Sequence, residues 1–131
     1  MLLLLCCGYA GIWGGAAGRW GAGMMGAAAL LSIPASRLDP SWGSTAYGVF
    51  AVDLCLMIGL TIVAVRSRRY WPLWAAGLHL NTVISHCATM VVPRVVPKVY
   101  QTLESVWSVP ILIVMVIGIS LDRRHAIAST D

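Results

Sequence analysis

Ionisable side chains interrupt two of the apolar stretches in this sequence, although a charged group inside hydrocarbon is costly. Asp53 lies in the stretch 47–65, and His79 and His86 lie in the stretch 71–92. A carboxylate can accept a hydrogen bond or a proton, and an imidazole can in addition ligate a metal centre. These residues therefore predict one of three chemistries: hydrogen bonding between helices, ligation of a macrocycle, or movement of protons or ions.

The positions of these residues along the chain predict their depths. The sequence RSRR at 66–69 is short, so the apolar stretches on either side of it should form antiparallel neighbouring helices. At about 1.5 Å per residue, Asp53 lies about 20 Å, His79 about 15 Å and His86 about 26 Å from these arginines. His79 therefore has no charged or hydroxyl partner at its level. We expect an intramembrane polar cluster of Asp53, Asn81, Thr82, His86, Ser108 and Glu104.

A structural role for this cluster is the favoured interpretation. The Asp53 carboxylate would accept a hydrogen bond from the neighbouring helix, from His86, Thr82 or Asn81. Such bonds average about 0.6 kcal/mol in membranes, but an unpaired carboxylate costs more, so pairing is expected whatever the function. The bond would hold the two helices in register, and this interpretation needs no cofactor.

Two alternatives give the same residues a function. In the first, His79 or His86 ligates haem or a bacteriochlorophyll. Ala75 stands four residues before His79, and this Ala-x-x-x-His spacing is similar to that of light-harvesting polypeptides. In the second, Asp53, His86 and Glu104 form the path of a small oligomeric channel or transporter. The sequence has no HExxH, GxSxG or P-loop motif, so we expect no catalysis.

The composition indicates a membrane protein. Of the 131 residues, 59% are hydrophobic and only 11% are charged, and the mean hydropathy is +0.81. A water-soluble domain of this length could not bury so much apolar surface. We therefore expect one all-α domain over residues 1–131, a polytopic transmembrane helical bundle. The formal charge of +4 comes from Lys and Arg between the apolar stretches, which predicts topology and not nucleic-acid binding.

The apolar stretches predict four to five membrane spans. They cover residues 2–18, 21–36, 47–65, 71–92 and about 99–121. A spanning helix needs roughly 20 residues, so the second stretch is short and could cross, thin the bilayer or re-enter.

The basic residues predict the orientation of the chain in the membrane. In a five-span arrangement, one side holds Arg37, Arg94 and Lys98, and the other holds Arg19, Arg66, Arg68, Arg69, Arg123 and Arg124. The positive-inside rule then places the N-terminus in the periplasm and the C-terminus in the cytoplasm of a bacterial inner membrane.

Proline, tryptophan and glycine residues predict where helices begin or bend, where they meet the membrane surface and where they pack together. Pro97 suits the first turn of the last helix, and Pro110 would then kink that helix. Trp71 should lie at a membrane interface, where amphipathic rings collect. GxxxG spacing, which lets two helices approach closely, predicts helix packing through Gly11, Gly14, Gly15 and Gly18.

Several of these features occur together in one group of proteins. The sequence RYWPLW at Arg69–Trp74, with Asp53, His86 and WSVP at Trp107–Pro110, resembles short, uncharacterised integral membrane proteins of alphaproteobacteria, notably sphingomonads. The likeness covers residues 47–124. The resemblance implies an inner-membrane location with four or five spans, and it implies no particular activity. His79 stands where the pattern has Gln, which argues against a shared ligand at this position.

The short predicted loops leave little of the chain outside the bilayer with which to bind or process a substrate. We therefore predict a small inner-membrane accessory or assembly subunit of a larger respiratory or photosynthetic complex. Its partners would be the lipid bilayer and other integral membrane subunits, against which its helices pack.

Overall fold

A computed structural model describes residues 1–38, 47–91 and 106–128, apart from the side chains of residues 35–38 and 127. These residues form helices and no strand, so the all-α prediction is confirmed. The helices are α1 (Leu2–Trp13), α2 (Gly15–Leu38), α3 (Tyr47–Arg66), α4 (Trp71–Val91) and α6 (Ser108–Ala128).

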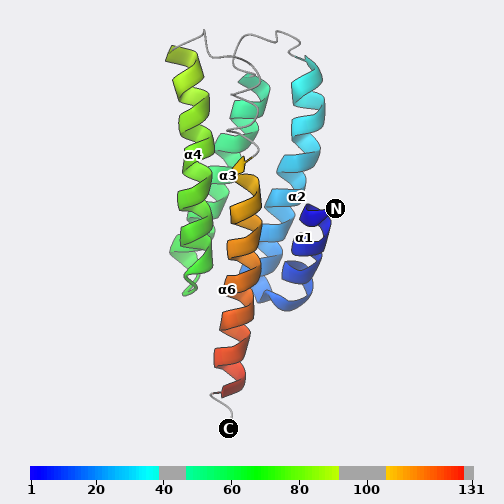
Figure 1. Cartoon of the computed structure of the whole chain (residues 1–131), viewed down its shortest axis with the longest axis vertical. Helices are drawn as coiled ribbons and strands as arrows, with labels where there is room; N and C mark the ends of the chain where they lie inside the picture. Colours follow the sequence, from blue (N-terminus) through cyan, green and yellow to red (C-terminus); the bar gives the residue numbers. More distant parts are fainter. Residues whose placement is uncertain (39–46, 92–105, 129–131) are drawn as a thin grey trace.

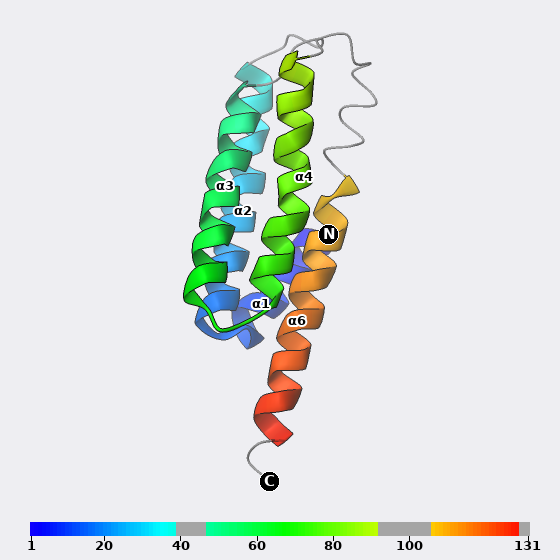
Figure 2. The ribbon, with the colours of Figure 1, turned by 90° about the vertical axis from the view of Figure 1, so that its left-hand side faces the viewer.

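The helices form a ring in which each element packs against the next. The long helices α2, α3 and α4 stand side by side along the molecule, as Figure 1 shows. α1 and α6 both begin near the middle of the bundle and lie along its lower half (Figure 2). Contacts run from α1 to α2, α3, α4 and α6, and then from α6 back to α1. The ring therefore closes around one shared core.

A sharp turn at Gly14 and Gly15 separates α1 from α2. Gly15 has a φ of 61°, in the left-handed region that favours glycine. The predicted boundaries 2–18 and 21–36 are therefore wrong, and Arg19 lies inside α2. At about 1.5 Å per residue, α1 is about 18 Å long and α2 about 36 Å. The short helix is thus the first and not the second.

The helices differ in hydropathy as well as in length. Among the described residues, α3 is the one helix both long and apolar enough to cross a membrane, with a mean hydropathy of 2.4 in its most apolar window. Only 17% of that window is buried inside the bundle. α4 is as long as α3, but its polar side chains lower its hydropathy. α3 therefore presents most of its apolar surface outward.

The indole of Trp71 packs in the core between α2 and α6. It is 2% exposed and lies against Gly21 of α2 and Gly118 of α6, where any side chain would collide with the indole. Met24 of α2 fits against Gly59 of α3 in the same way. The ring of Trp71, predicted for a membrane interface, thus packs against protein, because glycines on two facing helices leave room for it.

Two of the four glycines predicted to pack helices do so. A Cβ on Gly14 would lie 2.5 Å from the carbonyl oxygen of Ala10, and one on Gly18 would lie 2.7 Å from the same atom. A Cβ on Gly11 would meet nothing within 4 Å, and Gly15 serves the turn. The packing prediction is therefore wrong for Gly11 and Gly15, because the turn interrupts the helix on which the GxxxG spacing was counted.

The start of α6 changes the role of Pro110. α6 begins at Ser108, so Pro110 falls in its first turn, where backbone amides have no partner within the helix. The missing N–H of Pro110 therefore costs no helical hydrogen bond, and the preceding stretch, against which a kink would be measured, lies mostly outside the described residues. Pro97, where the last helix was expected to start, lies outside the described residues.

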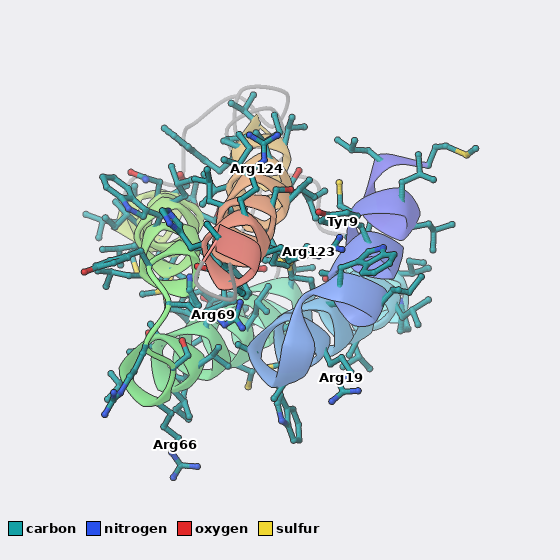
Figure 3. The ribbon with its side chains drawn as sticks, turned by 90° about the horizontal axis from the view of Figure 1, so that it is seen from below. Tyr9, Arg19, Arg66, Arg69, Arg123 and Arg124 are labelled. Atoms are coloured by element: carbon teal, nitrogen blue, oxygen red, sulfur yellow. The ribbon has the colours of Figure 1, made fainter. Side chains whose placement is uncertain are left out.

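The arginines predicted to share one side lie at one end of the bundle, which Figure 3 shows from below. This basic end is formed by the α1–α2 turn, the α3–α4 turn and the end of α6. The side chain of Arg37, and all of Arg94 and Lys98, lie outside the described residues. We define the basic end by Arg19, Arg66, Arg68, Arg69, Arg123 and Arg124.

Replacing Gly14 with Ala is expected to destabilise the protein by about 1–3 kcal/mol, because the new Cβ would overlap backbone atoms of Ala10 and Gly18. Gly11→Ala is the matched control. It adds a methyl group in open space and improves helix propensity, so it should be neutral or stabilising by up to about 1 kcal/mol. Unfolding in detergent, followed by tryptophan fluorescence, measures both. Equal stability of the two variants would contradict the close turn.

Candidate functional site

One helix of the site carries a carboxylate and its neighbour carries two imidazoles. Asp53 lies in the first half of α3, and His79 and His86 lie in α4. The histidines are seven residues apart, close to two helical turns, so both face α3. Because α3 and α4 are antiparallel and in contact, Asp53 lies at a level between the two histidines.

Direct hydrogen bonds join these three residues. The Nε2 atom of His86 lies 2.8 Å from Oδ2 of Asp53. The Nε2 atom of His79 lies 3.0 Å from the main-chain carbonyl oxygen of Asp53 and 3.8 Å from Oδ1 of its carboxylate. A carbonyl oxygen only accepts, so His79 carries its proton on Nε2 and donates it. Asp53 therefore receives a hydrogen bond from each histidine.

These hydrogen bonds stabilise the fold because the three residues are largely buried. His86 is 0% exposed, His79 is 5% exposed, and the side chain of Asp53 is 13% exposed. The ring of Phe50 packs against His86 at 5.6 Å between centroids. In such surroundings a polar group without a partner costs the full free energy of its lost hydration. The side chains of Asp53 and His86 therefore depend on each other, and His79 depends on the main-chain carbonyl of Asp53.

The expectation that His79 has no charged or hydroxyl partner at its depth is wrong, because the Asp53 carboxylate lies 3.8 Å away, and the hydrogen bond itself goes to a main-chain carbonyl. The depth count compared side chains with side chains and left out main-chain acceptors. The carbonyl group of Asp53 points toward the next turn of α3, and this offset brings it within reach of His79. The main-chain oxygen of Asp53 thus accepts the hydrogen bond from His79.

The other residues of the predicted cluster divide into three groups. Thr82 and Ser108 line one cavity together with Asp53. Asn81 instead donates to carbonyl groups of its own helix, at Gly77 and Leu78, at 3.4 and 3.3 Å, so its placement in a bond with Asp53 is wrong. Glu104 lies outside the described residues.

The cavity lies where α1 and α6 begin, beside the Asp53 carboxylate. Its volume is about 600 Å³, in the range of pockets that hold organic ligands. Each of the five helices contributes to its wall. The polar groups on the wall are Ser32, Asp53, His79, Thr82 and Ser108, and the apolar ones include Leu3, Met25, Leu56, Ile111 and Leu112.

The geometry does not favour macrocycle ligation by His79 or His86. The Nε2 atoms of both are already hydrogen-bonded within the chain, and both rings are buried. Haem or a bacteriochlorophyll would have to displace those bonds. The described residues also hold no group of three or more His, Cys, Asp or Glu side chains that could bind a metal ion.

The sequence analysis missed a salt bridge that ties the α3–α4 turn to α6. The Nη1 atom of Arg69 lies 2.8 Å from Oδ2 of Asp122. Both side chains are about one-third exposed, so the pair contributes up to about 1 kcal/mol. A signal was available, because RSRR and DRRH each close an apolar stretch on the same predicted side.

A second missed contact ties α1 to α6. Tyr9 and Ser120 have their hydroxyl oxygens 2.9 Å apart. Ser120 donates to the carbonyl of Val116, so Tyr9 is the donor to Ser120. The guanidinium of Arg123 lies 3.9 Å from the centroid of the Trp13 ring, a cation–π contact beside Tyr9 (Figure 3). Nothing in the spacing of these residues predicts the pairing.

Comparison with known proteins finds no matching family model, no matching curated protein and no matching solved structure. The class of this protein therefore rests on its own geometry: an all-α bundle with a buried Asp–His cluster between two neighbouring helices.

A double-mutant cycle with Asp53→Ala and His86→Ala tests the cluster. Each single variant is expected to be destabilised, because it leaves a buried partner without a hydrogen bond. The coupling free energy should be about 1–2 kcal/mol, at the upper end for hydrogen bonds between membrane helices. Unfolding in detergent supplies the four stabilities.

Asn81→Ala combined with Asp53→Ala is the matched control for that cycle. Asn81 bonds only to its own helix, so we expect a coupling near zero. Equal coupling in the two cycles would show that the stability changes reflect general loosening of α4, and it would contradict a specific Asp53–His86 bond.

Proposed function

We propose that the chain is a polytopic inner-membrane protein. The support is its apolar exterior: large hydrophobic side chains are exposed on every described helix, for example Leu4, Leu30, Ile58, Ile84 and Ile117. In water each would cost the free energy of hydrating apolar surface, roughly 25 cal/mol per Å². In hydrocarbon the same surface costs nothing, so a bilayer is the solvent that suits this fold.

The helices other than α3 fit this proposal for separate reasons. Of the polar residues that lower the hydropathy of α4, His79, Thr82 and His86 are buried, and both histidines are bonded to Asp53. Asn81 and Ser85 are partly exposed and bond to carbonyl groups of α4 itself. The charges of α6 follow its apolar part, from Asp122 onward. With the basic end in the cytoplasm, α2, α3, α4 and α6 are the proposed spans. α1, at about 18 Å, reaches through roughly half of a 30 Å hydrocarbon layer.

Within the membrane we propose an accessory or assembly subunit without catalysis of its own. One observation carries this proposal: the buried residues Asp53, His79 and His86 bond to one another within the chain, while large apolar side chains are exposed on its outer surface. Such a chain offers a partner shape and apolar contact, not a reactive group. The likeness of residues 47–124 to short alphaproteobacterial membrane proteins agrees with this location.

A small channel or transporter is the second candidate, and the cavity beside Asp53 favours it. Oδ2 of the carboxylate is bonded to His86, but no described residue donates a hydrogen bond to Oδ1. A carboxylate oxygen with spare accepting capacity, on the wall of a cavity of about 600 Å³, could take up a proton or a cation.

The subunit proposal is tested by recovery from native membranes. The tagged chain should resist alkaline carbonate and be released by mild detergent, and the same integral membrane proteins should co-purify at a constant molar ratio, measured by mass spectrometry. The control is an unrelated inner-membrane protein with the same tag. Recovery of the chain alone, as a monomer, would rule out the subunit role.

The transporter candidate is tested by proton movement into proteoliposomes, followed with an internal pH dye. Asp53→Asn keeps an acceptor for His86 but removes the charge, so flux should fall at least tenfold. Ser85→Ala is the control, because Ser85 bonds to a carbonyl of its own helix and should leave flux unchanged. Flux that persists in Asp53→Asn, or equals that of empty vesicles, would eliminate this candidate.

A further inference from the structure

We propose that the groove between α3 and α4 at the basic end binds an anionic phospholipid, with the headgroup phosphate at Arg68 and an acyl chain along the helices. This inference rests on the proposed membrane location and on no particular partner. The groove has a volume of about 660 Å³ and is separate from the cavity beside Asp53.

The polar end of the groove has the chemistry of a phosphate site. Ser67, Arg68 and Arg69 follow one another in the α3–α4 turn and all line the groove. Arg68 is exposed and forms no salt bridge with a described residue. Arg69 uses Nη1 for Asp122, which leaves other N–H groups of its guanidinium for a phosphate oxygen.

An unused hydroxyl lies among these arginines. The Oγ atom of Ser67 is buried and has no hydrogen-bond partner among the described residues. Buried hydroxyl groups are nearly always paired, so a missing partner indicates a group from outside the chain. A phosphate oxygen supplies an acceptor, and rotation about the Ser67 Cα–Cβ bond turns the hydroxyl toward it.

The excess of positive charge at the basic end favours the binding of an anion. The basic end carries six arginines, Arg19, Arg66, Arg68, Arg69, Arg123 and Arg124, against Asp122 among the described residues. Each basic side chain near a membrane surface contributes favourably to binding of anionic lipid. A zwitterionic headgroup would gain less, because its own ammonium would lie among guanidinium groups.

Away from the arginines the groove becomes apolar. Its walls there are Met57 of α3 and Leu73, Ala76 and Gly77 of α4. A Cβ on Gly77 would meet nothing within 4 Å, so the missing side chain leaves an open trough. Gly77 stands six residues into α4, about 9 Å along the helix from the turn that carries Arg68, which is a depth an acyl chain occupies below its phosphate.

The test compares two lipids that differ only in headgroup. Purified protein is reconstituted into nanodiscs of phosphatidylcholine and phosphatidylglycerol with identical acyl chains, extracted with mild detergent, and the retained lipid is quantified by mass spectrometry. Wild type should retain phosphatidylglycerol in preference to phosphatidylcholine. Arg68→Gln should lower that preference about fivefold, since one basic side chain is removed.

Gly77→Phe tests the apolar half of the groove. Its ring would fill the trough, so the retained phosphatidylglycerol should fall at least fivefold with unchanged thermal stability. Gly23→Phe is the matched control: Gly23 of α2 also has open space around its Cβ, at a similar distance from the basic end, but does not line the groove. It should retain lipid like wild type.

The outcomes separate this inference from the proposed function. Equal retention of both lipids by wild type, or equal loss in Gly77→Phe and Gly23→Phe, would overturn the groove. Competition by glycerol 3-phosphate as strong as that by phosphatidylglycerol would overturn the lipid and leave a phosphate site. A chain that carbonate releases from membranes would instead refute the membrane proposal itself.

Discussion

A carboxylate inside an apolar bundle must be paired, and the pairing of Asp53 with His86 is the constraint on which the other contacts depend. A distance of 2.8 Å between Oδ2 and Nε2 requires α3 and α4 to be antiparallel, adjacent and in one register. The same register brings His79 to the Asp53 carbonyl. It also sets the α3–α4 turn, which directs Arg69 toward Asp122 and Trp71 into the core.

The positions at which α1 and α6 begin then decide where the bundle of described residues is closely packed and where it has a cavity. α1 and α6 begin near the middle of the bundle and pack along its lower half, where glycines at positions 14, 18, 21 and 118 allow close approach (Figure 2). Among the described residues, a cavity lies beside Asp53 at the level where α1 and α6 begin. Contacts that tie α1, α4 and α6 together gather instead at the basic end.

The two faces of the α3–α4 pair have opposite chemistry. The inner face carries the Asp–His cluster, and the outer face carries apolar side chains that run up to the arginines of the turn. The buried core is mainly apolar and encloses the Asp–His cluster, while large apolar side chains also cover the exterior. The proposed lipid environment accounts for that apolar exterior. The proposed lipid groove and the proposed subunit role both use this outer face, so a partner could bind through lipid as well as directly.

Composition and charge, read from the sequence alone, determined the helical class, the shared end of the arginines, and the need of Asp53 for a partner on the next helix, because these follow from solvation and from chain length. Only the tertiary structure decided the α1–α2 turn at Gly15, the burial of Trp71 and the bond from His79 to a main-chain carbonyl. Each depends on which surfaces meet. The same residue type, glycine, forms a turn, allows a close helix contact or leaves an open groove, depending on what packs beside it. The spacing of residues predicts which side chains of one helix share a face, but it does not predict which backbone groups of another helix they meet.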